Sequence, residues 1–184
     1  MKKNDLIRVV GLIVIVIITI SASTEIKQSL VCGPLHFAGI TLGVTTDSEV
    51  KRLLGNGLYV KQEGDTGGRY FINPKGTATL HVVNFTDTIV GEVTVQEGVT
   101  IAKGQAKTAI SRWFNPKEGF GNGHSIHLGS TKDEVKKNLG DPSVESSLDE
   151  WKYYSSCACE TDTFFTVHFR NNQIWKVVFS APAG

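Results

Sequence analysis

The side chains that suit a metal ion lie in the second half of the chain. His124 and His127 are three residues apart, and Cys157 and Cys159 come before His168. Imidazole nitrogens and thiolates are the ligands that zinc prefers in proteins. His124 and His127, however, frame an extended approach to a predicted helix, and residues three apart in extended backbone point to opposite faces. We therefore expect neither a metal site nor a cofactor.

The three cysteines suit disulfide chemistry. Cys157 and Cys159 are close neighbours, so Cys32 can pair with either of them and leave one thiol over, or the two neighbours can close a strained loop. A redox centre more often has two residues between its cysteines and a helix N-terminus that lowers the thiol pKa. Here the pair lies in a stretch rich in Ser, Thr and Glu between predicted strands, which argues against redox catalysis.

The sequence lacks the common catalytic motifs. It has no Gly-x-Ser-x-Gly elbow, no His-Glu-x-x-His and no phosphate-binding glycine loop. The glycine-rich run at 119–123 has no predicted strand before it and no Lys-Ser/Thr after it, so we interpret it as a linker. Asp149 and Glu150 are adjacent acids of the kind that usually lies in a solvated loop. The sequence therefore predicts a protein that is not an enzyme, with no catalytic residue.

Large aromatic residues gather instead in the predicted strands: Tyr70, Phe71, Trp151, Tyr153, Tyr154, Phe164, Phe165 and Trp175. Neighbours along a strand point to opposite faces of a sheet. If helices cover only one face, one of the neighbours Tyr153 and Tyr154 must lie on the other face, and the same holds for Phe164 and Phe165. Tyr and Trp are prominent among the residues that dominate protein interfaces. The alternative interpretation is that most of these aromatics belong to the core.

A short sequence motif, which we call the helix phrase, contains the signals for a helix and for both of its ends. It occurs at 43–55 and again at 129–142, with a degenerate copy at 104–116. The two clear copies carry the Thr-x-x-Glu spacing of a capping box: Thr46 with Glu49, and Thr131 with Glu134. In each copy two aliphatic residues four apart form one apolar face, and a glycine then ends the helix. Helices of about two turns are marginal alone, so we expect them to pack against a sheet.

The strands that supply this sheet follow each helix. They are predicted at 69–72, 77–85 and 90–95, and again at 151–154, 164–169 and 174–179. We align 83–85 with 167–169, and 90–95 with 174–179. The degenerate copy is predicted to be a further helix that ends at Asn115-Pro116. The second half of the chain therefore has the predicted order helix, helix, sheet.

The N-terminus has the pattern of a targeting segment. Lys2, Lys3 and Arg8 are followed by an apolar run at 9–20 and by small residues at 21–23. About a dozen apolar residues suit a signal-peptide core better than a spanning helix, which needs about 20. Cleavage and retention as an anchor over 6–22 both stay open, and either places the body outside the cytoplasm, periplasmic or secreted.

The overall charge gives no reason to expect nucleic acid as a partner. The chain has 19 Lys+Arg and 18 Asp+Glu, for a formal net charge of +1. Neither nucleic acid nor an acidic membrane surface is recruited by a nearly neutral chain. Membrane contact is therefore expected only through the N-terminal segment.

The helix phrase, followed by a Trp/Tyr strand and an aliphatic hairpin, resembles a bacterial family of small outer-membrane assembly lipoproteins, the SmpA/OmlA (BamE) type. Two such units in tandem also resemble the β-lactamase inhibitory protein in layout. The matching residues of the last unit are Leu128, Gly129, Thr131, Val135, Leu139, Gly140, Pro142, Trp151 and Tyr153. Those of the first unit are Leu42, Gly43, Thr46, Val50, Leu54, Gly55 and Tyr70, without the closing proline. The resemblance implies short helices on one side of a continuous sheet.

Together these patterns predict an α+β protein with two tandem repeat units, 24–100 and 101–184, behind a signal peptide or anchor at 1–23. Each repeat packs short helices on an antiparallel sheet. The predicted function is that of a non-catalytic, extracytoplasmic protein-binding module in bacterial envelope assembly or maintenance. The alternatives are a secreted inhibitor of an extracellular enzyme and an uncharacterised small enzyme. The predicted partner is another envelope or secreted protein. The residues predicted to bind it occupy the sheet positions that the family resemblance indicates, and they are Tyr70, Trp151, Tyr153 and Trp175.

Overall fold

The computed structural model describes residues 36–61, 67–84, 88–102, 104–111, 114–116, 119, 126–154 and 164–181. The chain divides into one part of residues 1–30 and a second of residues 31–184, so every described residue belongs to the second part. The predicted signal peptide or anchor, His124 and all three cysteines lie outside the described residues.

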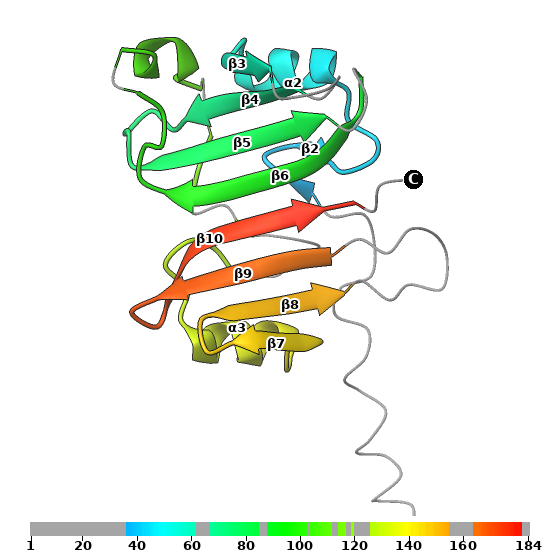
Figure 1. Cartoon of the computed structure of the whole chain (residues 1–184), viewed down its shortest axis with the longest axis vertical. Coiled ribbons are helices and arrows are strands. Elements are labelled where there is room, and N and C mark those ends of the chain that lie inside the picture. The colour runs from blue at the N-terminus through cyan, green and yellow to red at the C-terminus, as the bar shows by residue number, and fades with distance from the viewer. Residues whose placement is uncertain are drawn as a thin grey trace, which may run out of the picture. The chain divides into compact units, whose positions relative to one another are not determined.

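An eight-stranded antiparallel sheet is the largest element of the described part (Figure 1). Its strands are β3 (Leu58–Lys61), β4 (Gly67–Ile72), β5 (Ala78–Asn84), β6 (Val90–Glu97), β7 (Val144–Ser147), β8 (Glu150–Tyr154), β9 (Phe164–Arg170) and β10 (Gln173–Ser180). The spatial order is β3-β4-β5-β6-β10-β9-β8-β7, so two four-stranded meanders meet where β6 pairs with β10. A separate short hairpin joins β1 (His36–Phe37) to β2 (Ile40–Thr41). The predicted antiparallel sheet is confirmed, whereas its two edge strands, β3 and β7, were not predicted.

The two clear helix phrases form helices with the predicted ends. α2 (Asp47–Leu54) and α3 (Lys132–Leu139) each begin with a complete capping box, at Thr46 and Thr131 respectively. Each helix ends at a glycine with positive φ: Gly55 has φ 96° and ψ −173°, and Gly140 has φ 79° and ψ −165°. This backbone region is essentially restricted to glycine. The glycines therefore fix where the chain leaves each helix.

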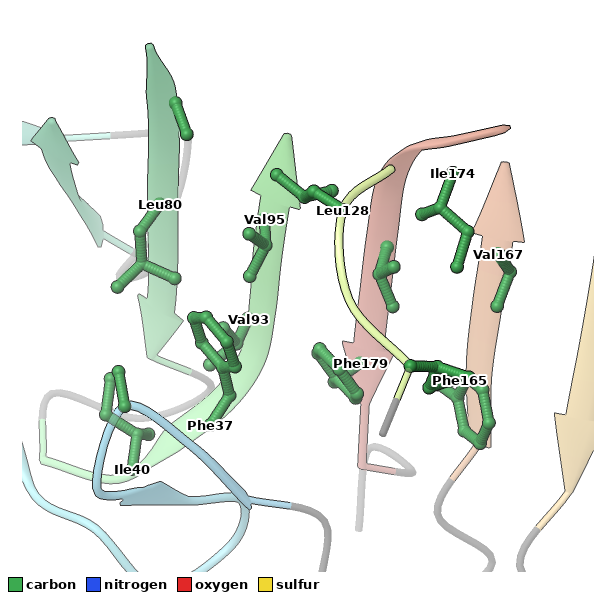
Figure 2. Close-up of a cluster of buried hydrophobic side chains, with 14 of the residues drawn as sticks. Phe37, Ile40, Leu80, Val93, Val95, Leu128, Phe165, Val167, Ile174 and Phe179 are labelled. Carbon is green, nitrogen blue, oxygen red and sulfur yellow. The ribbon is translucent and has the colours of Figure 1, made fainter. Parts of the chain in front are cut away.

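One hydrophobic core lies along a single face of the sheet. α2 and α3 each contribute two buried aliphatic residues to it, as the predicted i, i+4 spacing requires. Figure 2 shows Phe37 and Ile40 of the β1–β2 hairpin and Leu128 among the buried side chains of one cluster, which also includes the strand residues Leu80 and Val167. The helices, this hairpin and the segment around Leu128 thus cover the same face, which we call the covered face.

The chain approaches the two helices through matching backbone hydrogen bonds. Four bonds define the pattern: Gly43 N to Val90 O and Val90 N to Thr45 O, both 2.9 Å, and Gly129 N to Ile174 O and Ile174 N to Ser130 O, both 2.8 Å. Each segment before a helix is therefore fastened to the last strand of the meander that follows that helix.

A β-bulge occurs at the matching place in β6 and β10. Gly91 is the extra residue of β6 opposite β5, and Trp175 is the extra residue of β10 opposite β9. The core residues Ile174 and Val177 are separated by two residues in place of the usual one. Because a bulge interrupts the alternation of side chains, Trp175 and Lys176 both lie away from the covered face.

The degenerate third phrase does not form the predicted helix. Among the described residues of this segment, Ala106–Ala109 alone are helical, as a four-residue 3-10 helix (η1), and Ile110 then forms a parallel bridge with Ile72. The start of η1 has no side-chain cap, and the β-branched Thr108 and Ile110 favour extended backbone. The prediction of a helix that reaches Asn115 is wrong, and so is the predicted order helix, helix, sheet.

The predicted alignment of 83–85 with 167–169 is wrong by one residue. Val82 pairs with Val93, and Val167 pairs with Val177, and all four are buried on the covered face. Val83 pairs with Glu92 and points the other way. A one-residue slip in a strand changes the face of every side chain, so Val82 and not Val83 matches Val167.

Candidate functional site: the open face of the sheet

The face of the sheet opposite the hydrophobic core, which we call the open face, carries mostly polar side chains. Period-two alternation places these between the buried residues of each strand. Two rows of residues that pair across neighbouring strands cross its centre, and we call them the central rungs. One rung contains Tyr70, His81, Thr94 and Val178, and the next contains Ile72, Thr79, Gln96, Lys176, His168 and Glu150. Both central rungs include strands of the two meanders, so residues that are far apart in the sequence lie on one surface.

Two of the four predicted partner-binding residues lie on the covered face. Trp151 and Tyr153 are each 3% exposed and belong to the hydrophobic core. Trp151 packs edge-on against Phe169, with ring centroids 4.6 Å apart. Tyr153 stacks on Phe165 at 5.0 Å and donates a hydrogen bond of 3.3 Å to Gly140 O. Burial removes both residues from the candidate surface, because a partner could reach them only by displacing the α3 side of the core.

The other two predicted residues, Tyr70 and Trp175, lie on the open face and are half-buried. The expected division of neighbouring aromatics is confirmed at the same time. Tyr154 is 47% exposed while Tyr153 is buried, and Phe164 is half-buried while Phe165 is buried. The open face therefore carries aromatic side chains in both meanders.

Tyr70 and His81 form a flat stack on the open face. Their ring centroids are 3.9 Å apart and their planes differ by 8°. The Nε2 atom of His81 is buried and has no hydrogen-bond partner in the described part of the chain. A β-carbon at Gly68 would lie 2.3 Å from this nitrogen, so the glycine makes room for the ring. Burial lowers the pKa of His81 to about 4, and the ring is neutral at pH 7.

A groove of about 550 Å³ crosses the open face beside this stack. Its floor includes Tyr70, His81, Thr94, Gln96 and Lys176, and its wall is formed by Thr100, Ile101, Ala102 and Gln105. Thr79 attaches the wall to the floor: its hydroxyl donates to Gly98 O at 2.7 Å and accepts from Thr100 N at 3.3 Å. The volume falls in the range of ligand-binding pockets, which is about 300–1,000 Å³, but the lining is largely polar.

Trp175 lies beside this groove with cationic neighbours. The guanidinium carbon of Arg170 lies 4.3 Å from the centroid of the Trp175 ring, and the His168 ring lies 6.2 Å from it. Lys176, the next residue of the bulge, forms no ion pair and no hydrogen bond with any described residue. Burial first, and then the positive charge of Lys176, lowers the pKa of His168. The surface around Trp175 is therefore positively charged because of its arginine and lysine.

The ionisable groups of the groove do not form a catalytic arrangement. His81, Glu92 and Lys176 line it, but within the described residues no hydrogen bond or ion pair joins any two of them. Nucleophilic and acid–base sites place such groups within hydrogen-bonding reach of each other. Where placement is described, no three His, Cys, Asp or Glu side chains come together to hold a metal ion. The arrangement is better suited to binding a polar surface than to a covalent step.

The described part contains no helix long and apolar enough to span a membrane. A second hollow, of about 520 Å³, opens at the strand ends between Thr77, Glu97, Leu128 and Arg170. Arg170 thus contacts both this hollow and the Trp175 ring.

Sequence reasoning missed the groove for a definite reason. The alternation of the polar residues Thr79 and His81 with the apolar residues Leu80 and Val82 is visible in the sequence and could have revealed the floor. The wall could not be predicted, because 100–105 was assigned to the approach of a helix that does not form. The position of Trp175 depends on a bulge, which alternation alone does not reveal.

The fold and this surface define a class: an antiparallel sheet with short capped helices on one face and an aromatic, polar surface on the other. No protein-family model matches the chain, and no curated protein matches it. Among solved structures, the chain is similar to that of a DUF4309 family protein, YjgB from Bacillus subtilis subsp. subtilis str. 168. The two share 14% sequence identity with a TM-score of 0.46, over 78% of this chain and 83% of that chain.

These comparisons correct the predicted family resemblance. The resemblance to the SmpA/OmlA (BamE) lipoproteins and to the β-lactamase inhibitory protein is wrong, since no model of these or of any other family matches the chain. The residues that carried it are helix caps, apolar helix positions and sheet aromatics. Any short capped helix on an antiparallel sheet needs such residues, so they do not identify a family.

Proposed function

We propose that this chain is a non-catalytic protein-binding module that acts outside the cytoplasm, in assembly or maintenance of a bacterial cell envelope. The observation that carries the proposal is the one-sided core: helices cover one face of the sheet, while Tyr70 and Trp175 remain on the other. Tyr, Trp and Arg dominate protein interfaces, and all three occur on the open face. The binding residues in this proposal are Tyr70 and Trp175, with Arg170 added.

The extracytoplasmic location rests on the N-terminal pattern. Lys2, Lys3 and Arg8 precede an apolar run, as in export signals. In this proposal the body acts as a periplasmic or secreted protein, and membrane contact is made only through residues 6–22 where they are retained.

We also propose that the two meanders with their helices are tandem repeats of one unit. The support is the matching capping boxes, the matching bonds from each pre-helix segment to its strand, and the bulge shared by β6 and β10. In this proposal the repeats share one sheet across the β6–β10 pair. A surface built from both repeats then explains why Tyr70 and Trp175, from different halves, lie on one face.

The test is a crosslinking capture experiment on the full chain in its native envelope extract. We compare the wild-type protein with Tyr70→Ala/Trp175→Ala, and use Tyr59→Ala as the matched control. Tyr59 is 50% exposed but packs against Arg69 at the edge of the covered side. Folding of each variant is checked by circular dichroism and urea unfolding.

The expected result is a partner that the wild type and Tyr59→Ala capture and the folded double variant loses. If the double variant captures the same partner as the wild type, the open face is not the binding surface. If the captured partner is an extracellular enzyme whose activity falls on binding, the module is an inhibitor. Turnover of a substrate in the groove, lost in Glu92→Gln, would instead make the chain a small enzyme.

A further inference from the structure

We propose that the partner presents acidic side chains to the open face, and that they bind at Lys176 and Arg170, the two cations next to Trp175. This inference rests on the proposed function, because it specifies the chemistry of the protein that binds the same surface. The occupant is an extended acidic segment of another protein that lies along the groove.

The first support is an imbalance of charge on the open face of β8 to β10. This part of the face carries Lys152, Arg170 and Lys176 against one carboxylate, Glu150. Lys152 is already 3.7 Å from Glu150 Oε1. Arg170 and Lys176 thus remain as cations without a carboxylate partner among the described residues.

Carboxylates on the neighbouring strand do not neutralise these two cations. Glu92 of β6 lies in the same groove, but its oxygens accept hydrogen bonds of 3.4 Å from the hydroxyls of Thr94 and Ser180. It forms no ion pair with Lys176 in the described structure. His168 faces Lys176 across the β9–β10 ladder, and burial first and then the lysine charge lower its pKa, against the opposing effect of Glu150 at 3.5 Å. The lysine ammonium is therefore available to an incoming carboxylate.

The bulge in β10 places an anchor beside this charge. It brings Trp175 and Lys176 to the same face, whereas regular alternation would separate them. The Arg170 guanidinium stacks on the Trp175 ring at 4.3 Å, which orients it while its N–H groups remain able to donate to a carboxylate in bidentate fashion. An aromatic ring beside two cations, of which it orients Arg170, suits an acidic segment that also carries an apolar side chain.

The groove continues from this point across the other meander. Lys176 pairs with Gln96 and forms one end of the floor, and the Tyr70–His81 stack lies farther along it. Gln96 and Thr94 supply an amide and a hydroxyl that can bond to a peptide backbone. An apolar ligand is disfavoured, because it would remove the Lys176 ammonium from water without a hydrogen-bond partner.

The experiment uses the isotopically labelled full chain and three short synthetic peptides of alternating sequence: Glu-Thr, Gln-Thr and Lys-Thr. NMR titration follows the backbone amides of β10 and the Trp175 indole N–H. We expect the Glu-Thr peptide alone to shift the signals of Arg170, Trp175 and Lys176, with binding that weakens as salt is added. Lys176→Gln and Arg170→Gln are each expected to weaken it about three- to tenfold. The control Lys75→Gln, in the exposed turn between β4 and β5, is expected to leave it unchanged.

The inference is overturned if the Gln-Thr peptide binds as tightly as the Glu-Thr peptide, or if the signals of Arg170, Trp175 and Lys176 do not shift. It is also overturned if Lys176→Gln and Lys75→Gln behave alike. Its failure differs from failure of the proposed function. In one outcome, the Tyr70→Ala/Trp175→Ala variant loses the captured partner, while Lys176→Gln and Arg170→Gln bind it as tightly as the wild type does. That result supports the proposed protein-binding function and contradicts only the inference that the partner is acidic.

Discussion

Arg69 and Asp47 form a bidentate ion pair that ties the start of α2 to strand β4. The Arg69 Nε atom lies 2.6 Å from one carboxylate oxygen of Asp47, and Nη2 lies 3.1 Å from the other. Arg69 Nη1 also donates to Asn56 O at 2.8 Å, so one side chain holds both ends of the helix. Lys132, the first residue of α3, forms an ion pair with Asp149 at 3.0 Å, and its ammonium lies 5.9 Å from the Trp151 ring centroid. An ion pair therefore holds the start of each helix, to a strand residue at α2 and to a turn residue at α3.

The first prediction concerns the carboxylate of Asp47. Burial acts to raise its pKa, but Arg69 and Lys51 outweigh burial and hold the pKa at about 2. The folded state therefore gains stability above the unfolded pKa of 3.8, and loses it as the pH falls towards 2. We expect Asp47→Asn to lower the free energy of unfolding at pH 7 by about 1 kcal/mol, after allowance for solvent screening. Urea unfolding between pH 7 and pH 2 measures this, and the two proteins should converge at the acidic end.

Asp141→Asn is the control for this prediction. Asp141 is 80% exposed and lies 3.5 Å from the Lys136 ammonium, so its loss should change stability by less than about 0.5 kcal/mol. Equal effects of the two substitutions, or a difference for Asp47→Asn that does not shrink with acid, would contradict the role assigned to the Arg69 pair.

The helices were predictable because residues close together in the sequence determine where each helix begins and ends. Thr46 and Glu49 satisfy each other's backbone donors within four residues, and Gly55 supplies a backbone conformation that other residues avoid. The failed helix near Ala106 shows the limit of this reasoning. A glycine before it and a proline after it suggested the phrase, but no capping side chain was present, and pairing of Ile110 with Ile72 decided the structure. That pairing is tertiary and leaves no local signal.

The candidate site was predictable only in part, for a related reason. Alternation shows that Tyr153 and Tyr154 lie on opposite faces, but it does not show which face the helices cover. That choice depends on the handedness with which each helix returns to the sheet. Trp151, Tyr153 and Trp175 are all sheet positions in the sequence, and only the structure shows that Trp151 and Tyr153 lie in the core, whereas a bulge places Trp175 on the open face.

The second prediction separates the core tryptophan from the surface tryptophan. Trp151 is 3% exposed, so Trp151→Ala should lower the free energy of unfolding by about 3–5 kcal/mol. Trp175→Ala should lower it by no more than about 1 kcal/mol, because its ring packs only on one side against Arg170 and His168. Urea unfolding of both variants checks this. Similar losses in the two would show that Trp175 is structural and would weaken its assignment to the binding surface.

The third prediction concerns the space that Gly68 leaves for His81. A β-carbon at this position would lie 2.3 Å from His81 Nε2 and 3.2 Å from Val82 O. Gly68→Ala must therefore displace the His81 ring from its stack on Tyr70, at a cost of about 1–2 kcal/mol. We also expect the His81 pKa to rise towards 6.5 as the ring becomes more exposed to water. Thermal unfolding and an NMR titration of His81 measure the two effects.

Gly104→Ala provides the matched control for Gly68→Ala. Its β-carbon would meet no atom within 4 Å, so stability should be unchanged or raised by up to about 1 kcal/mol through the unfolded chain. If Gly104→Ala lowered the free energy of unfolding as much as Gly68→Ala does, the destabilisation would be a general effect of replacing glycine. A stable Gly68→Ala variant with an unmoved His81 signal would contradict the packing described for the stack.

The last prediction follows from the His81 pKa itself. The folded protein binds a proton at His81 only near pH 4, whereas the unfolded chain binds it near pH 6.5. Above pH 6.5 both states are neutral at this residue and it imposes no penalty. As the pH falls from 6.5 to 4, the unfolded chain takes up a proton that the folded protein does not, so the free energy of unfolding decreases by about 3 kcal/mol. His81→Phe keeps a ring against Tyr70 but cannot titrate, so it should lack this decrease and become more stable than the wild type near pH 4.5. Parallel urea unfolding across this range isolates the effect, because every other group titrates in both proteins. Parallel slopes, or a His81 midpoint near 6.5 in the folded wild type, would show that water reaches the buried nitrogen and that the floor of the groove is more open than the stack implies.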